Sequence, residues 1–214
     1  MAAAKKRVGI LISGRGSNMA SLIEAAQAPD YPAEIALVVS NRPGAAGLVR
    51  AQAAGVATAI VDHRLFPARA DFDAALGRAF EEAGIELICL AGFMRILTDG
   101  FVQAWLGRML NIHPSLLPLF KGLHPHRQAL EAGVRIHGCT VHFVVPELDS
   151  GPIVAQAAVP VLPGDTEEML ASRVLAEEHR LYPLGLSLVA AGQARLEGGR
   201  TVFANGSRTA LGLA

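Results

Sequence analysis

The sequence predicts an α/β fold of the Rossmann-like type, in which a parallel sheet becomes mixed towards the C-terminus and helices cover both faces. Short runs rich in Val, Ile and Leu alternate with longer segments of helical periodicity, the pattern of strands joined by crossover helices. The composition is 51% hydrophobic but only 5% aromatic, so aliphatic side chains build the core, as in strands covered on both faces. Later in the chain, two strand-like runs are joined by too few residues for a parallel crossover.

The first half of the chain is expected to supply the parallel strands, with right-handed crossovers between them. The predicted strands are residues 8–13, 35–40, 58–61, 87–91 and 109–113. The predicted helices are residues 19–27, 45–54 and 71–83. In the last of these, Phe72, Leu76 and Phe80 recur at helical spacing, which predicts one apolar face.

The second half departs from this alternation. Residues 140–145 and 153–161 read as two strands joined by residues 146–152, so we expect an antiparallel pair. Thr166 is a plausible N-cap for a helix that runs to about residue 181, and Pro183 marks a break or kink. The tail from about residue 195 is Gly-rich and polar, and we expect it to be peripheral. No linker divides the chain, so we predict one domain over residues 1–214.

Composition and charge argue against several classes of protein. The 19 basic side chains equal the 19 acidic ones, whereas proteins that bind nucleic acid usually carry a basic excess. No stretch approaches the about 18 apolar residues of a membrane span, and the N-terminal apolar run is too short for a signal peptide. We therefore expect a cytoplasmic protein with no nucleic-acid or membrane partner.

Cysteine and histidine patterns predict neither a disulfide nor a metal site. Cys89 and Cys139 lie in apolar, strand-like runs, which favours buried, reduced thiols. His124, His126 and His137 suggest a metal site at first sight, but no cysteine or carboxylate completes a ligand set. We predict no metal.

A glycine-rich loop, Ser13-Gly14-Arg15-Gly16-Ser17-Asn18, joins the first predicted strand to the first predicted helix. Glycine at such a junction lets backbone N–H groups approach a phosphate in front of the positive end of the helix dipole. Met19 stands where the dinucleotide fingerprint needs its third glycine, and there is no Walker A lysine. The loop therefore indicates a single phosphate, with a purely geometric role for the glycines as the alternative.

Asn111 and His113 end a predicted strand, where ligands of α/β sheets bind. Residues two apart on a strand share a face, so both side chains can meet one substrate atom. An amide donor and a protonated imidazole can together stabilise an oxyanion and transfer a proton. A carboxylate such as Asp149, in the turn between the late strands, would orient the imidazole. The alternatives are local backbone contacts for Asn111 and His113 and a simple turn role for Asp149.

Six segments occur in the order found in folate-dependent formyltransferases, and the chain resembles that family from residue 8 to about residue 184. The segments are residues 13–18 (SGRGSN), 91–97 (AGFMRIL), 111–118 (NIHPSLLP), 122–127 (GLHPHR), 137–142 (HGCTVH) and 147–152 (ELDSGP). The resemblance implies 10-formyltetrahydrofolate as formyl donor. It implies glycinamide ribonucleotide, an intermediate of de novo purine synthesis, as the amine acceptor.

The resemblance also implies a role for each site residue. The catalytic set is Asn111, His113 and Asp149, and Asn111 and Asp149 also contact the folate. The ribonucleotide is bound by Gly16, Ser17, Asn18 and Glu178, and the folate by Arg69, Met94, Arg95, Ile96, Leu97, Val145, Pro146, Glu147 and Leu148. Read from the residues alone, the 94–97 segment is equally compatible with ordinary core, and Glu178 with a solvated helix face.

Three other functions stay open at this point. A formyl-folate hydrolase would use the same Asn-His-Asp set with water as acceptor, but usually has an extra N-terminal domain. An enzyme that formylates initiator tRNA would need a further C-terminal domain and a basic surface. A non-catalytic folate- or phosphate-binding module would not need His113 or Asp149. We expect a monomer or a weak homodimer.

Overall fold

The computed structural model describes residues 4–204, which fall into two compact units that meet in the sequence between Leu110 and Asn111. The single domain expected from the sequence remains a prediction. No helix in the described range has both the length and the apolar character needed to cross a membrane.

The first unit is built on four parallel strands in the order β3-β2-β1-β4. The strands are β1 (Lys6–Ile12), β2 (Ala33–Ser40), β3 (Ala57–Ile60) and β4 (Leu87–Leu90). The helical segments are α1 (Ser17–Ala26), α2 (Ala46–Ala53), η1 (His63–Leu65), α3 (Arg69–Glu82) and α4 (Asp99–Ala104). The predicted elements of this half are present, and α4 and η1 are additions that the sequence pattern did not predict.

Helices cover both faces of this sheet, as predicted. A Cβ added at Gly9 of β1 would collide with Phe80 of α3, and a Cβ added at Gly47 of α2 would collide with Ile12 of β1. Residues 9 and 12 are an odd number apart, so they point to opposite faces of the strand. Thus α3 packs on one face and α2 on the other, each at a close contact where glycine stands.

The second unit contains the antiparallel pair that makes the sheet mixed. The strand β5 (Met109–His113) continues from the first unit into the second, and the strand order here is β5-β6-β7. Strands β6 (Ile136–Phe143) and β7 (Ile153–Pro160) pair antiparallel, with Thr140 opposite Gln156 and a register shift between Val141 and His142. Strand β6 begins four residues before the predicted start, because the apolar alternation that marks it becomes clear only after Cys139.

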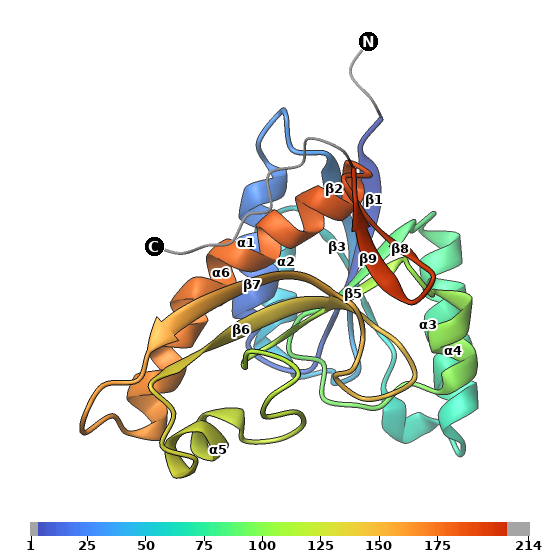
Figure 1. The fold of residues 1–214 in the computed structure, drawn as a ribbon. Coiled ribbons are helices and arrows are strands. Elements are labelled where there is room, and N and C mark those ends of the chain that lie inside the picture. The colour runs from blue at the N-terminus through green and yellow to red at the C-terminus, as the bar shows by residue number, and fades with distance from the viewer. Residues whose placement is uncertain (1–3, 205–214) are drawn as a thin grey trace. The chain divides into compact units, whose positions relative to one another are not determined.

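The long helix α6 (Glu167–Ala190) lies along β6 and β7 (Figure 1). The Thr166 hydroxyl accepts a hydrogen bond from Met169 N, which confirms the predicted N-cap. The expected end near residue 181 is wrong, because the helix continues through Pro183 to Ala190. Its apolar face explains the continuation: Leu181, Tyr182 and Leu186 are buried, so packing outweighs the local cost of proline.

Two further elements of this unit were not predicted. Helix α5 (Pro125–Glu131) begins with proline in its first turn, a position where the missing N–H costs no helical hydrogen bond. Strands β8 (Ala194–Glu197) and β9 (Arg200–Phe203) form an antiparallel hairpin whose turn contains Gly198 and Gly199, both at positive φ. The hairpin occupies the start of the segment predicted to be a peripheral tail, and the remainder of that segment, residues 205–214, lies outside the described residues.

Candidate active site

The C-terminal end of β5 places His113 beside Asp149 in the second unit. Nδ1 of His113 lies 3.4 Å from Oδ2 of Asp149, and both side chains are buried. Nε2 of His113 lies 2.9 Å from the carbonyl oxygen of Phe120. A carbonyl oxygen can only accept, so Nε2 carries the proton of that hydrogen bond, while Nδ1 faces a carboxylate. A ring protonated on both nitrogens satisfies both neighbours, which is the form needed to stabilise an oxyanion.

Asp149 is held in place by the backbone around it. The N–H of Gly122 donates to Oδ2 of Asp149 at 2.9 Å. The residue has φ 48°, in the left-handed region that aspartate and asparagine tolerate better than most residues. Two residues further on, a Cβ at Gly151 would collide with the carbonyl oxygen of Phe143. The turn between β6 and β7 therefore has a constrained path that delivers the carboxylate to His113.

Asn111 is positioned by His142, a residue to which the sequence analysis assigned no role. Nδ2 of Asn111 lies 3.2 Å from Nε2 of His142, and Nδ1 of His142 lies 2.9 Å from the carbonyl oxygen of Phe143. Burial lowers the pKa of His142, so the ring is neutral, with its proton on Nδ1 and a lone pair on Nε2. In the sequence, His142 stood out only as a histidine inside an apolar strand-like run, in the 137–142 segment that resembles the formyltransferases.

The segment predicted to close over the folate, residues 145–149, is half-buried at Val145, exposed in its middle and buried at its last residue. Leu148 is 55% exposed, and Pro146 and Glu147 are exposed as well, whereas Asp149 is buried. Lys121 contacts the turn at two residues. Its Nζ donates to Ser150 Oγ at 2.6 Å and lies 3.9 Å from Oε1 of Glu147. The turn thus presents apolar side chains outwards while its catalytic candidate points inwards.

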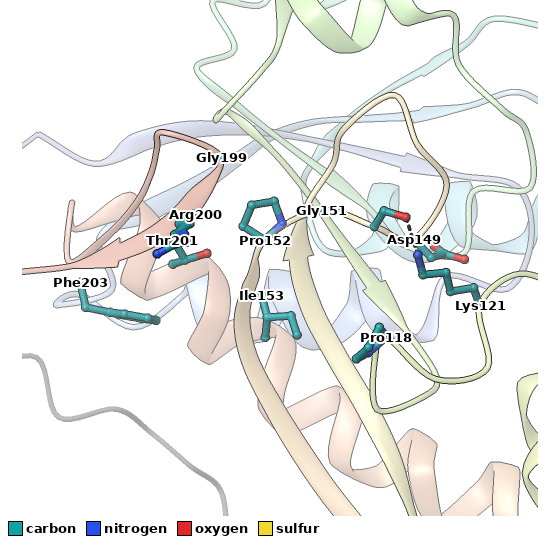
Figure 2. A pocket seen from close by; sticks show the side chains of 11 residues that line it. Pro118, Lys121, Asp149, Gly151, Pro152, Ile153, Gly199, Arg200, Thr201 and Phe203 are labelled. Atoms are coloured by element: carbon teal, nitrogen blue, oxygen red, sulfur yellow. Dashed lines mark hydrogen bonds between the residues drawn. The ribbon is translucent and has the colours of Figure 1, made fainter.

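A cavity of about 440 Å³ adjoins this turn (Figure 2). Asp149 is the only residue of the predicted site that lines it. The other lining residues are Pro118, Lys121, Ser150, Gly151, Pro152, Ile153, Gly199, Arg200, Thr201 and Phe203. The β8–β9 hairpin therefore forms one wall of a hollow that reaches the candidate catalytic carboxylate.

Glu178, the predicted acidic contact to the acceptor, is buried on α6 with 6% of its surface exposed. This burial rules out the solvated helix face that the sequence left open. A buried carboxylate needs partners that compensate for lost hydration.

In the first unit, the glycine-rich loop leads directly into α1. Gly16 has φ 68° and occupies the N-cap position, and the N–H of Gly47 donates to Gly14 O at 3.0 Å. A side chain at Gly16 would press on the backbone of Gly47 as well as adopt an unfavourable φ. Within residues 4–204, no side chain caps the N-terminus of α1, and its first turn has no acidic residue. The start of the helix is therefore suited to an anion.

The segment predicted to line the folate pocket follows β4. Met94 and Ile96 are 67% and 61% exposed, so they are not ordinary core, whereas Leu97 is buried. The Arg95 guanidinium lies over the Phe72 ring, 5.2 Å from its centroid. The segment thus offers an exposed apolar surface, as a flat pterin ring requires. Arg69, the first residue of α3, is exposed.

The remaining ionisable groups give no sign of redox or metal chemistry. Cys89 and Cys139 are buried free thiols, and burial raises the pKa of Cys139, which keeps it protonated and unreactive. Between residues 4 and 204, no three His, Cys, Asp or Glu side chains are grouped so that they would hold a metal ion.

Comparisons with known proteins show the family and the fold of the chain. The Formyl transferase family matches residues 6–186. The phosphoribosylglycinamide formyltransferase of Escherichia coli is 46% identical over 187 residues, covering 87% of this chain and 88% of that protein. A crystal structure of glycinamide ribonucleotide transformylase 1 from Symbiobacterium toebii superposes with a TM-score of 0.90 at 48% identity, covering 93% of this chain and 94% of that one.

The chain also matches part of a larger protein. It is 54% identical over 188 residues to the trifunctional purine biosynthetic protein adenosine-3 of Gallus gallus, which covers 88% of this chain but only 19% of that protein. The chain thus spans about a fifth of the length of the trifunctional relatives that it matches, and nearly the whole length of the bacterial ones. On its sequence and its fold, the chain belongs to the formyl transferase family.

Proposed function

We propose that this chain transfers the formyl group of 10-formyltetrahydrofolate to the amine of glycinamide ribonucleotide, giving formylglycinamide ribonucleotide for de novo purine synthesis. The observation that carries the proposal is the buried His113–Asp149 pair at 3.4 Å, in which His113 shares the end of β5 with Asn111. Relatives of matching length from Escherichia coli and Haemophilus influenzae bear the name of this activity.

The proposed reaction is direct transfer. The amine nitrogen of the acceptor bonds to the formyl carbon, and the carbonyl electrons move onto oxygen. The Asn111 amide and the protonated His113 ring stabilise this oxyanion. Collapse of the tetrahedral intermediate breaks the bond to N10 of the folate, so the amine loses one proton and N10 gains one. Asp149 keeps His113 oriented and charged and assists proton removal from the amine.

His113 must exchange one hydrogen-bond partner to act in this way. Its Nε2–H donates to Phe120 O, so the formyl oxygen replaces that carbonyl as the acceptor. Asp149 stays beside Nδ1 throughout, because the N–H of Gly122 donates to the same oxygen, Oδ2, and holds the carboxylate there.

Each unit supplies binding groups for the proposed substrates. In the first unit, Gly16, Ser17 and Asn18 bind the acceptor phosphate at the start of α1. The exposed surface of Met94 and Ile96, with Arg95, Leu97 and Arg69, binds the folate. In the second unit, the turn of residues 145–149 binds the folate, and Glu178 binds the acceptor. The reaction requires no metal and no nucleic acid, and we propose that a cytoplasmic monomer or weak homodimer carries it out.

The test follows loss of the formyl group from 10-formyltetrahydrofolate by absorbance, with and without glycinamide ribonucleotide. Loss only in the presence of the ribonucleotide is the expected result. Equal loss without it would identify a hydrolase and overturn the proposal. Folate binding without turnover in either case would identify a binding module. A His113→Ala sample serves as the inactive control for contaminating activity.

A further inference from the structure

Three neighbouring strands of the first unit, β2, β1 and β4, are followed by chain segments that are joined by the hydrogen bonds of one residue, Ser13. Strand β1 ends at Ile12, directly before Ser13, and Ile12 pairs with Ser40, the last residue of β2. Strand β4, on the other side of β1, ends at Leu90 and leads into the segment that carries Met94. The segments that follow these three strands therefore lie next to one another at the carboxyl edge of the sheet.

The Ser13 side chain makes two hydrogen bonds at this place, one to each neighbouring chain segment. Its hydroxyl donates to Oδ1 of Asn41 at 2.7 Å and accepts from the backbone N–H of Met94 at 2.8 Å. Its own backbone N–H donates to Gly92 O at 3.2 Å. Ser13 and Asn41 are 5% and 1% exposed, so water does not readily replace these partners.

Asn41 is itself fixed on its far side. Nδ1 of His63 lies 2.8 Å from the backbone carbonyl oxygen of Asn41 and 3.3 Å from its Nδ2. The shorter contact is to an oxygen that only accepts, so His63 donates from Nδ1 to the backbone of Asn41. His63 thus holds the backbone of Asn41. The Ser13 hydroxyl already accepts from the Met94 N–H, so its own proton is directed to Oδ1 of Asn41.

We infer that Ser13, oriented by Asn41, is a positioning residue that fixes the 92–97 segment to the strand end from which the glycine-rich loop begins. The inference rests on the proposed function, because that function makes the 94–97 segment a folate surface. Ser13 touches neither proposed substrate. It acts by holding the Met94 backbone. Because Ser13 stands directly before Gly14, its hydroxyl fixes the position of the 92–97 segment relative to the glycine-rich loop.

The first test needs no substrate. Ser13→Ala removes the acceptor for the Met94 N–H, so amide hydrogen exchange at Met94, measured by NMR, is expected to be about tenfold faster or more. Ser40→Ala is the matched control, because Ser40 is also buried at a strand end but its hydroxyl bonds only to the backbone of Arg42. Unchanged exchange at Met94 in Ser13→Ala would overturn the inference even if the chain proved to have another function.

The second test separates positioning from general stability. Ser13→Ala is expected to raise KM for the formyl-folate about tenfold, with kcat and KM for the ribonucleotide changed less than about threefold. Asn41→Ala is expected to act in the same direction. Asn41→Asp should stay near wild type, because it keeps the oxygen that accepts from Ser13 and turns a second oxygen towards His63. A fall in kcat alone, or equal effects of Asn41→Ala and Asn41→Asp, would overturn the inference.

The double variant Ser13→Ala/Asn41→Ala tests whether the two residues act in series. If Asn41 acts through Ser13, the double variant has the KM of Ser13→Ala, whereas multiplied effects would show that the residues act separately. If the wild type shows no turnover, the proposed function fails, and the exchange experiment still decides the structural role of Ser13.

Discussion

Nδ2 of Asn111 lies 3.2 Å from Nε2 of His142, and His142 can only accept at that atom. The reason is that its other ring nitrogen already donates to Phe143 O and the buried ring is neutral. This contact uses one of the two amide hydrogens of Asn111 and fixes which way the amide faces. The second amide hydrogen is then left for the formyl oxygen, so His142 has a defined part in the proposed oxyanion site.

Replacing His142 by Phe should lower kcat about tenfold, because the amide of Asn111 loses the partner that orients it. His142→Gln keeps an oxygen that can accept from Asn111 and should retain most of the activity. Steady-state kinetics on both variants, with denaturant unfolding as a check on folding, measures the difference. Equal activity in the two variants would contradict the orienting role.

His113→Ala should lower kcat about a thousandfold, because it removes both a charged oxyanion donor and the group that manages the proton. KM for either substrate should change little, since the ring acts mainly on the transition state. Turnover near the wild-type rate would exclude His113 from the chemistry.

Asp149→Asn should lower kcat about a hundredfold while the folate dissociation constant stays within about threefold. Asparagine tolerates the left-handed backbone at this position and keeps an oxygen for Gly122 N, so the change removes mainly the charge beside His113. Pre-steady-state kinetics and folate titration measure the two effects. Glu131→Gln, at an exposed carboxylate of α5, is the control for a change of net charge.

Stability should fall as the pH is lowered below 6.5, because buried histidines resist protonation in the folded chain. The pKa of His137 is lowered to about 4, first by burial and then by the nearby His126. In the unfolded chain, His137 takes up a proton as the pH falls below about 6.5, whereas in the folded chain it does so only near pH 4. The contribution of His137 to the free energy of unfolding is therefore complete above pH 6.5 and is lost as the pH falls to about 4. The loss from His137 is at most about 3 kcal/mol.

Urea unfolding of the wild type and of His137→Gln at pH 7.5 and 4.5 measures this effect. The variant should show the smaller difference between the two pH values. His124→Gln, at an exposed histidine, should keep the wild-type difference. An unchanged difference in His137→Gln would show that other groups cause the acid sensitivity.

Gly151→Ala should destabilise the chain by about 2 kcal/mol and reduce kcat, because the added Cβ collides with Phe143 O in the turn that carries Asp149. Gly100→Ala on α4 meets no atom within 4 Å and should stay within about 1 kcal/mol of wild type. Thermal unfolding and turnover of the two variants give the comparison. Wild-type stability in Gly151→Ala would mean that the turn is less constrained than its geometry indicates.

Much of the fold follows from local patterns in the chain. The parallel strands of the first unit and the antiparallel β6–β7 pair were predicted from apolar runs and connection lengths. Pro183 misled the prediction of α6, because the buried face of the helix decides its length and a local rule for proline does not include that packing. Helix α5 and the β8–β9 hairpin are short and weakly periodic, so they left little signal.

The candidate site was predictable only in part. Asn111 and His113 are two apart on one strand, so their shared face follows from strand geometry. Asp149 lies far along the sequence, and only the resemblance to formyltransferases linked it to His113. The carbonyl of Phe120 and the N–H of Gly122 are backbone groups and carry no sequence signal at all, although they hold the His113 and Asp149 side chains.

The alternation along β5 ties folding to activity. Asn111 and His113 point to one face of the strand, while Leu110 and Ile112 point to the other and are buried. An insertion that slipped the strand by one residue would turn the amide and the imidazole towards the apolar face of the strand and the two aliphatic side chains towards Asp149. Such a chain would be unstable as well as inactive. One register of β5 therefore sets both the apolar packing and the place of the proposed catalytic side chains, so neither can be lost while the other is kept.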